Sequence, residues 1–252
     1  ERRPECLINA SGIGYYGDWG DEVLGEDARP GTGFLAETCV EWEKSALDAE
    51  ELGVRTVLMR TAVVFGKGAL QVFLIALPFR LFAGGPLGDG NFWFPWIHLD
   101  DMVGMYRWAI ENREVRGAVN ATAPDVRRQR EFAKEMGKAL GRPSWFPTPA
   151  FALRLVLGDF SSLVLDGQRA EPRNAQAHGY AWRFPTLASG LALSCTLSIC
   201  ASAAACGGKS LKRGTATSCA PAPAANTISV IEGASATMRS AGAASRSVTP
   251  RS

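Results

Sequence analysis

The sequence predicts an α/β protein built on a largely parallel sheet. Short apolar runs rich in β-branched residues alternate with longer segments whose apolar residues recur every three or four positions, the order typical of strand–helix–strand units. The strand-like runs are apolar throughout, as expected where helices cover a sheet on both faces. With 252 residues, of which 46% are hydrophobic and 21% charged, the chain can also bury a substantial core.

The first half of the pattern begins with an expected strand at Cys6–Ser11, a short apolar run that ends in small residues. A helix is expected over Phe34–Leu52, where apolar positions lie three and four apart, and Gly53 ends it. The run Arg55–Phe65, RTVLMRTAVVF, reads as a second buried strand.

The second half begins with an expected helix at Gln71–Phe82, which Pro78 interrupts and which is therefore no membrane span. Phe94–His98 reads as a strand, and Asp100 or Asp101 is expected to cap a helix over Met102–Asn112. A strand over Gly117–Ala121 and a helix over Arg130–Leu140 complete the pattern.

From about Ala188 the composition changes to Ala, Ser, Thr, Gly and Cys without periodicity, so residues 188–252 are predicted to be a disordered tail. This tail also resembles GC-rich DNA translated in a wrong frame. Its start is uncharged over Pro185–Gly208, but the many hydroxyl side chains argue against a membrane anchor. Six basic residues and one acidic residue give the tail +5, which leaves −3 for residues 1–187 out of the total of +2. A mildly acidic globular part disfavours nucleic-acid binding.

Cysteine usage points to a reducing compartment. Only Cys6 and Cys39 lie in the predicted globular part, and the cysteine spacing of the tail fits no common zinc pattern. Nothing near residue 1 resembles a signal peptide. We therefore expect a cytoplasmic protein without a metal, whose partner is a small-molecule substrate and not nucleic acid or a membrane. Its oligomeric state stays open.

Six segments, in order along the chain, resemble the epimerase family of atypical short-chain dehydrogenase/reductases. They cover roughly residues 5–187 and read NASGIGYYGD, FLAETCVEWEKSA, VRTVLMRTAVVFGKG, LPFRLFAGGPLGDGNFWFPWIHLDDM, GAVNATAP and DGQRAEPRNAQAHGYAWRFPTL. The resemblance implies part of a Rossmann-like sheet with flanking helices over residues 1–119. It also implies a substrate-side lobe over residues 120–187, similar to the C-terminal domain of unknown function in that family.

The resemblance further implies an NAD(P)-dependent oxidoreductase or epimerase of a small polar, sugar-like substrate, with NADP or NAD as its cofactor. Family members carry a GxxGxxG turn that binds the cofactor pyrophosphate at a helix N-terminus. No glycine cluster of this sequence has that strand–turn–helix context, so about the first hundred residues are expected to be missing. A non-catalytic cofactor-binding or regulatory protein is the alternative, and a truncated product with an exposed sheet edge is a third possibility.

The catalytic pair of typical relatives, Tyr-x-x-x-Lys, is absent. In the matching register of the helix the chain has Leu35 and Cys39, and Lys44 lies about 140° further around the helix. At the preceding strand end, Ser11 is a candidate hydrogen-bond donor to the substrate, or a small residue chosen for packing. Tyr16 is a candidate proton donor, although paired tyrosines more often pack their rings and bond their hydroxyls within the protein.

By resemblance, the cofactor would contact the strand ends, where glycine allows a close backbone approach. The residues expected there are Ser11, Gly12, Tyr15, Val63 and Val64. Val64 reads equally well as a buried strand end.

A segment with several glycines resembles a lid over the substrate pocket, or else a surface loop above an aromatic cluster. The expected pocket residues are Arg80, Asn91, Trp93, Trp96 and Arg169. Arg169 could hold an anionic group bidentately or form a structural salt bridge. His98 is expected to be structural and His178 to be a loop residue. After ATAP the chain departs from the family pattern, with Val126-Arg127-Arg128-Gln129.

Overall fold

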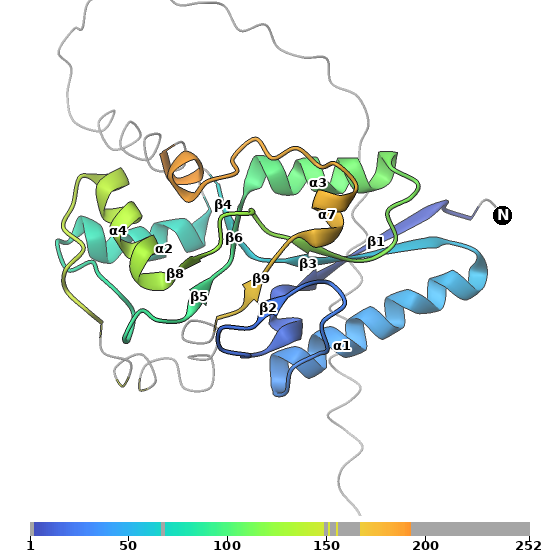
Figure 1. The fold of residues 1–252 in the computed structure, drawn as a ribbon, viewed down its shortest axis with the longest axis horizontal. Coiled ribbons are helices and arrows are strands. Elements are labelled where there is room, and N and C mark those ends of the chain that lie inside the picture. Colours follow the sequence, from blue (N-terminus) through green and yellow to red (C-terminus); the bar gives the residue numbers. More distant parts are fainter. Residues whose placement is uncertain (1–2, 67–68, 149–150, 152–154, 156–166, 193–252) are drawn as a thin grey trace, which may run out of the picture. The chain divides into compact units, whose positions relative to one another are not determined.

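The computed structural model describes residues 3–66, 69–148, 151, 155 and 167–192 (Figure 1). All of them belong to one compact unit, Glu1–Gly207, and the second unit, Gly208–Ser252, lies outside the described residues. Within the described ranges, no helix combines the length and the apolar character needed to cross a membrane.

Short helices and strands alternate along the described chain. The helices are α1 (Phe34–Leu47), α2 (Leu70–Arg80), α3 (Leu99–Glu111), α4 (Gln129–Leu140) and α7 (Arg173–Ala177), with 3-10 helices η1 (Ile13–Tyr16) and η2 (Asp48–Leu52). The strands are β1 (Cys6–Gly12), β2 (Val23–Leu24), β3 (Arg55–Thr61), β4 (Val63–Phe65), β5 (Trp93–Phe94), β6 (Trp96–His98), β7 (Gly117–Ala121), β8 (Arg127–Arg128) and β9 (Arg169–Ala170).

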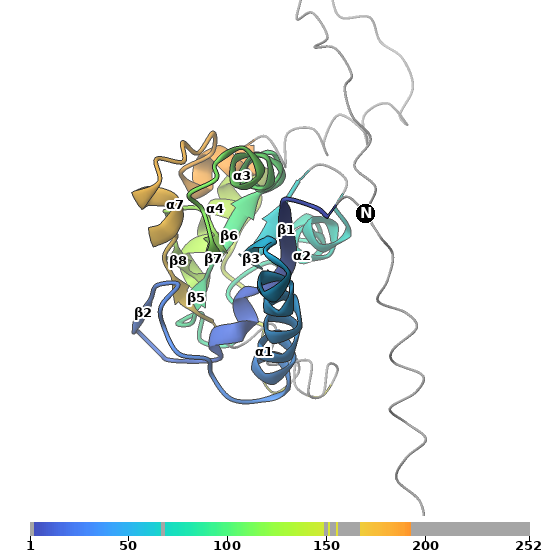
Figure 2. The ribbon, with the colours of Figure 1, turned by 90° about the vertical axis from the view of Figure 1, so that its right-hand side faces the viewer.

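The central sheet is parallel in the order β1–β3–β7, which confirms the predicted fold class. Helix α1 packs against one face of it, and α3 lies on the opposite side (Figures 1 and 2). Val57, Met59 and Val119 of the sheet meet Met102 and Met105 of α3 in one buried cluster. Covering a sheet on both faces requires the continuous apolar runs that the sequence shows.

Two predicted strands are each divided in two. The run Arg55–Phe65 breaks at Ala62, where the chain changes partner: the Ala62 N–H donates to Ala121 O of the central sheet, and the Val63 N–H donates to Pro95 O. From there β4 pairs with β6 in a separate parallel ladder. The run Phe94–His98 breaks at Pro95, which has no N–H to donate, so β5 pairs antiparallel with β8 instead.

The predicted helix Phe34–Leu52 is helical throughout, whereas the predicted starts of the Met102–Asn112 helix and of the tail were wrong. Helix α1 ends at Leu47 and continues as η2 up to Gly53, whose φ of 76° confirms it as the stop. Helix α3 begins at Leu99, and its cap is His98, whose Nδ1 accepts the Asp100 N–H at 3.1 Å. The tail starts later than predicted, because residues 187–192 are helical and Leu191 is fully buried.

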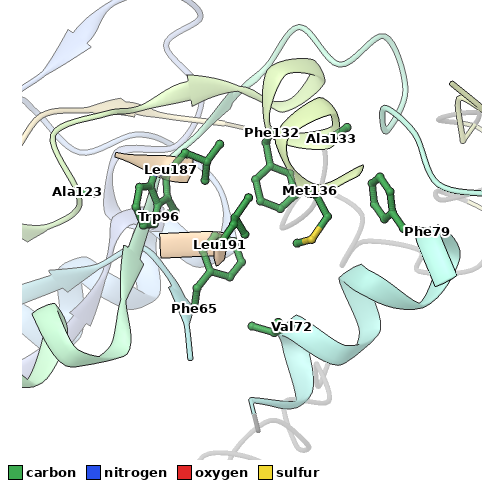
Figure 3. Packing of buried hydrophobic residues seen from close by; sticks show 10 residues of the cluster. All are labelled: Phe65, Val72, Phe79, Trp96, Ala123, Phe132, Ala133, Met136, Leu187 and Leu191. Carbon is green, nitrogen blue, oxygen red and sulfur yellow. The ribbon is translucent and has the colours of Figure 1, made fainter. Parts of the chain in front are cut away.

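A second core joins the remaining elements. Phe65, Trp96, Phe132 and Leu191 belong to it, together with Val72, Phe79, Ala123, Ala133, Met136 and Leu187 (Figure 3). The Phe65 and Phe132 rings stack with centroids 5.5 Å apart. Because most of these residues come from β4, β6, α2, α4 and the helical residues 187–192, this cluster holds those elements together.

Candidate functional site

The strands of the central sheet end side by side. In the ladder, Gly12 of β1 lies opposite Thr61 of β3, and Thr61 lies opposite Ala121 of β7. Sheets of this type bind ligands beyond these carboxyl ends. A Cβ placed on Gly12 would make ordinary van der Waals contact with the Cys39 Sγ at 3.7 Å, so α1 packs against the strand end on that side.

A buried ion pair lies directly behind this edge. Ser11 and Arg60 are partners in the ladder, and both point to Glu43 on α1. The Arg60 Nε and Nη2 donate to the two carboxylate oxygens of Glu43 at 2.9 and 2.8 Å, and the Ser11 hydroxyl donates to Glu43 Oε1 at 2.7 Å. Both charged side chains are about 5% exposed. The Ser11 proton, predicted to serve a substrate, is thus donated to Glu43 in this structure.

Tyr16 extends the same network. Its hydroxyl donates to Asn120 Oδ1 at 2.7 Å and accepts from Arg60 Nη1 at 2.8 Å, and its ring is fully buried. Burial raises the pKa of Tyr16 to about 12, although the neighbouring Arg60 opposes this shift. Tyr15 packs edge-to-face on Tyr16, and the Arg60 guanidinium lies 3.5 Å from the centre of the Tyr15 ring. Proton donation by Tyr16 would therefore require breaking its bond to Asn120.

Glu26 connects the network to the C-terminal part. Its Oε1 accepts the backbone N–H groups of Asn120 and Asn174, both at 3.1 Å. Burial raises the pKa of the Glu26 carboxyl. Arg60 Nη1 also donates to the Glu26 carbonyl at 3.1 Å. The strand ends, η1 and the start of α7 are thus fixed relative to one another by polar contacts.

Four residues of this network were not predicted from the sequence: Glu26, Glu43, Arg60 and Asn120. One signal was present. Arg60 interrupts the apolar run of a strand predicted to be covered on both faces, and a buried arginine requires a carboxylate partner. The identity of that partner depends on how α1 packs on the sheet, which the sequence pattern does not specify.

The positions that match the absent catalytic pair carry no proton-transfer group. Leu35 is half-buried, and Cys39 is buried close to Gly12. Burial raises the pKa of the Cys39 thiol, which keeps it neutral. No group of three metal-ligating side chains occurs in the part of the chain that the structure describes.

Two further buried polar atoms of the central sheet region, one in the middle of β1 and one just after β7, have no partner among the described residues. The Thr122 hydroxyl follows β7 and is buried without a hydrogen bond among the described residues, as is the Asn9 amide nitrogen of β1. Val63 and Val64 of β4, predicted to contact the cofactor, are half-buried beside β6.

The predicted pocket residues separate into two groups. Asn91, Trp93 and Arg169 lie together: the Arg169 guanidinium is 4.7 Å from the centre of the Trp93 ring, and Asn91 O accepts from Arg128, which also lies over Trp93. Trp96 is instead enclosed in the second core, with its indole N–H donated to Asp125 O at 2.9 Å. The prediction that Trp96 faces an open pocket does not match this placement.

The other predicted residues have local partners. Arg80 ends α2, with its guanidinium 5.6 Å from the centre of the Phe73 ring. His98 is structural as expected: it caps α3 and packs on Phe184 with ring centroids 4.0 Å apart. His178 ends α7 and bonds through Nδ1 to Asn174 O.

Comparison with known proteins identifies relatives along most of the described chain. Residues 148–192 match a family described as a domain of unknown function, DUF1731. The chain is 41% identical over 184 residues to an epimerase family protein, the chloroplastic SDR39U1 homolog of Arabidopsis thaliana, covering 73% of this chain and 53% of that protein. It is 39% identical over 189 residues to the epimerase family protein YfhF of Bacillus subtilis, covering 74% of this chain and 62% of that protein.

Solved structures agree with these relatives. The human epimerase family protein SDR39U1, determined with NADPH, has 33% identity and a TM-score of 0.72, covering 77% of this chain and 66% of that one. UDP-glucose 4-epimerase of Thermus thermophilus, determined with NAD, shares the fold at 16% identity and a TM-score of 0.59. The chain therefore spans between about half and two thirds of the length of these relatives. Together with the six motifs in order, these similarities show that the chain belongs to the epimerase family of SDR39U1-type proteins within the atypical short-chain dehydrogenase/reductases.

Proposed function

We propose that this chain is the substrate-side part of an NAD(P)-dependent oxidoreductase or epimerase that acts on a small polar, sugar-like substrate in the cytoplasm, without binding nucleic acid or membranes. The observation that carries the proposal is the carboxyl edge at which Gly12, Thr61 and Ala121 end neighbouring strands, in a chain 33% identical to a human protein whose structure contains NADPH. Residues at this edge face the region where sheets of this type bind nucleotides.

The residues present fit the nicotinamide end of such a cofactor. Gly12 ends β1 without a side chain, and the Thr122 hydroxyl, which has no hydrogen bond among the described residues, follows the end of β7 two strands away. In this proposal Ser11, Gly12, Tyr15, Val63 and Val64 contact the cofactor, which would supply the hydride chemistry when bound. Because the Ser11 proton is donated to Glu43, Ser11 would serve a ligand only as a hydrogen-bond acceptor.

The test is a titration of NADPH and NADH, followed by the fluorescence of the reduced nicotinamide. Gly12→Ala should keep the fold, since the new Cβ would make only ordinary contacts, at 3.7 Å from the Cys39 Sγ and 3.8 Å from the Gly14 nitrogen, and should weaken binding about tenfold, which corresponds to roughly 1.4 kcal/mol. Ser45→Ala, on the exposed face of α1, is the control and should bind like the original chain. The titration is made on the 252-residue chain and on a chain extended upstream in its reading frame. If neither chain binds NADPH or NADH saturably, the proposal is overturned.

A non-catalytic cofactor-binding protein is the second candidate. It is favoured by one specific observation: the hydroxyl protons of Ser11 and Tyr16 are both donated to protein acceptors, and Leu35 and Cys39 occupy the positions of the usual pair. NADPH binding without oxidation in the presence of a panel of sugars and small carbonyl compounds would favour this candidate. NADPH oxidation with any of them would exclude it.

A further inference from the structure

Helix α2 is apolar on two faces, and only one of them is buried. Val72 and Phe79 lie on the inner face, toward Met136 of α4 in the second core (Figure 3). The outer face of α2 and the segment that follows α4 expose further large apolar side chains. These residues, which we call the α2 patch, are Phe73, Leu74, Leu77, Leu81, Phe82, Trp145 and Phe146.

Backbone contacts hold the two segments of the α2 patch together. The Phe146 N–H donates to Gly84 O at 3.2 Å, and the Thr148 N–H donates to Pro86 O at 2.8 Å. A Cβ on Gly85 would lie 2.2 Å from the Phe146 carbonyl oxygen, so the two backbones are in close contact. The outer face of α2 and the Trp145–Phe146 segment therefore form one continuous surface.

The backbone of Phe82, at the centre of this surface, is strained. Its φ is 60°, and in the part of the chain that the structure describes no other residue except glycine has a positive φ. A large side chain is unfavourable in this region, and residues held there are common at functional sites. Burial does not offset the strain, because Phe82 is 57% exposed. The position of the ring therefore points to a contact outside the single chain.

The charged groups of the α2 patch lie over its own aromatic rings. Residues 69–88 and 141–148 contain two arginines, Arg80 and Arg142, and no acidic residue. The Arg142 guanidinium is 4.3 Å from the centre of the Phe82 ring, and that of Arg80 is 5.6 Å from the centre of the Phe73 ring. The patch thus offers both partners of an arginine–aromatic contact, as a surface that pairs with its own copy across a two-fold axis must.

The area of the α2 patch also suits a dimer. Its seven side chains are between 36% and 74% exposed. At about 150–250 Å² per large side chain, they present roughly 800 Å² of apolar surface. The largest apolar patch of a typical monomer is about 300–600 Å², whereas each partner of a stable interface buries about 800 Å².

We propose that the α2 patch is the interface of a symmetric homodimer, in which a second copy of this chain covers the Phe82 and Trp145 rings. The arginine–aromatic contacts within one copy then also form between the two copies. The proposal concerns assembly and does not depend on cofactor binding, so it goes beyond the proposed function. The NADPH titration and a measurement of mass can each fail without the other.

The test is sedimentation velocity of the 252-residue chain over a range of concentrations. We expect a reversible equilibrium of monomer and dimer without larger species, because a two-fold interface closes on itself. Phe82→Gly should keep the fold, since glycine adopts a φ of 60° without strain, and should raise the dissociation constant of the dimer at least about tenfold. Trp145→Gln should also raise it.

Trp42→Gln is the matched control, because Trp42 of α1 is an exposed tryptophan that does not belong to the α2 patch. This variant should dissociate like the original chain, and circular dichroism should show the same fold for all variants. An unchanged dissociation constant in Phe82→Gly, dissociation of the dimer by Trp42→Gln, or growth into larger species would overturn the proposal.

A chain that stays monomeric at every concentration would overturn it as well. Hydroxyl-radical labelling of Trp145 in that monomer would then identify what the α2 patch does instead. Weak labelling would mean that another part of the same chain covers the patch, and strong labelling would leave it to a different partner.

Discussion

The pair Glu43–Arg60 gives the sharpest stability prediction. Replacing Glu43 by Ala removes three hydrogen bonds to its carboxylate, one from Ser11 and two from Arg60, at 2.7 to 2.9 Å. It also leaves the Arg60 guanidinium enclosed, with a side chain only 5% exposed. Removing one partner of a buried ion pair costs about 3–5 kcal/mol. Since domains are stable by only about 5–15 kcal/mol, this loss should be a large fraction of the total.

The assay is equilibrium unfolding in urea, with the midpoint and slope determined for each variant. Glu43→Ala should lower the midpoint strongly at an unchanged slope. Glu41→Ala, at an exposed position of the same helix, is the matched control and should change the free energy of unfolding by less than about 0.5 kcal/mol. The double variant Glu43→Leu with Arg60→Met, which removes both charges, should recover part of the loss, because Ser11, the Tyr16 hydroxyl and the Glu26 carbonyl still lose a partner. A cost below about 1 kcal/mol for Glu43→Ala would refute the reasoning.

Three further changes have defined outcomes. Tyr16→Phe leaves Asn120 Oδ1 without its donor and should cost about 1–3 kcal/mol in thermal unfolding, whereas no measurable cost would mean that water replaces the hydroxyl. Burial lowers the pKa of His98 below its ordinary value of 6.5, so the imidazole is protonated more readily in the unfolded chain and stability is lost as the pH falls below 6.5. His98→Asn keeps an acceptor that can cap α3 and should reduce this dependence of stability on pH. An equal pH dependence in the two proteins would contradict this role of His98. Asp101→Asn keeps only one acceptor oxygen for the N–H groups of Arg183 and Phe184, so hydrogen exchange should accelerate at one of these amides, and unchanged exchange at both would count against the role of Asp101.

The sheet was predictable because its signal is local. Cys6–Gly12, Arg55–Thr61 and Gly117–Ala121 are apolar runs, and covering by helices on both faces is the arrangement that such runs favour. The division at Ala62 was not predictable, because each half of the run is equally suited to a strand. The two halves differ only in their hydrogen-bond acceptors: the Ala62 N–H donates to Ala121 O, and the Val63 N–H donates to Pro95 O. Tertiary packing decides which acceptor each N–H meets.

The position of the candidate site along the backbone was predictable from the sequence, but the hydrogen-bond partners of its side chains were not. Gly12 and Ser11 are recognisable as a strand end of small residues. Whether the Ser11 proton faces a ligand or Glu43 depends on the rotation of α1, which periodicity fixes only approximately. The placement of Trp96 was unpredictable in the same way. Two tryptophans three residues apart look alike in sequence, yet on the two sides of Pro95 the Trp93 ring lies beside arginines and the Trp96 ring lies in the core.

The bonds of Asp101 have a consequence for the order in which the protein can be made. Its carboxylate partners lie 82 and 83 residues further along the chain, and Leu187 and Leu191 enter the aromatic core after them. During translation, α3 and the Phe65–Phe132 stack are therefore complete long before the residues that cover them. Contacts of such long separation form late, and exposed apolar surface of this kind promotes aggregation. A stop codon between Ala121 and Leu191 should thus yield a chain that contains the whole central sheet and still fails to remain in solution.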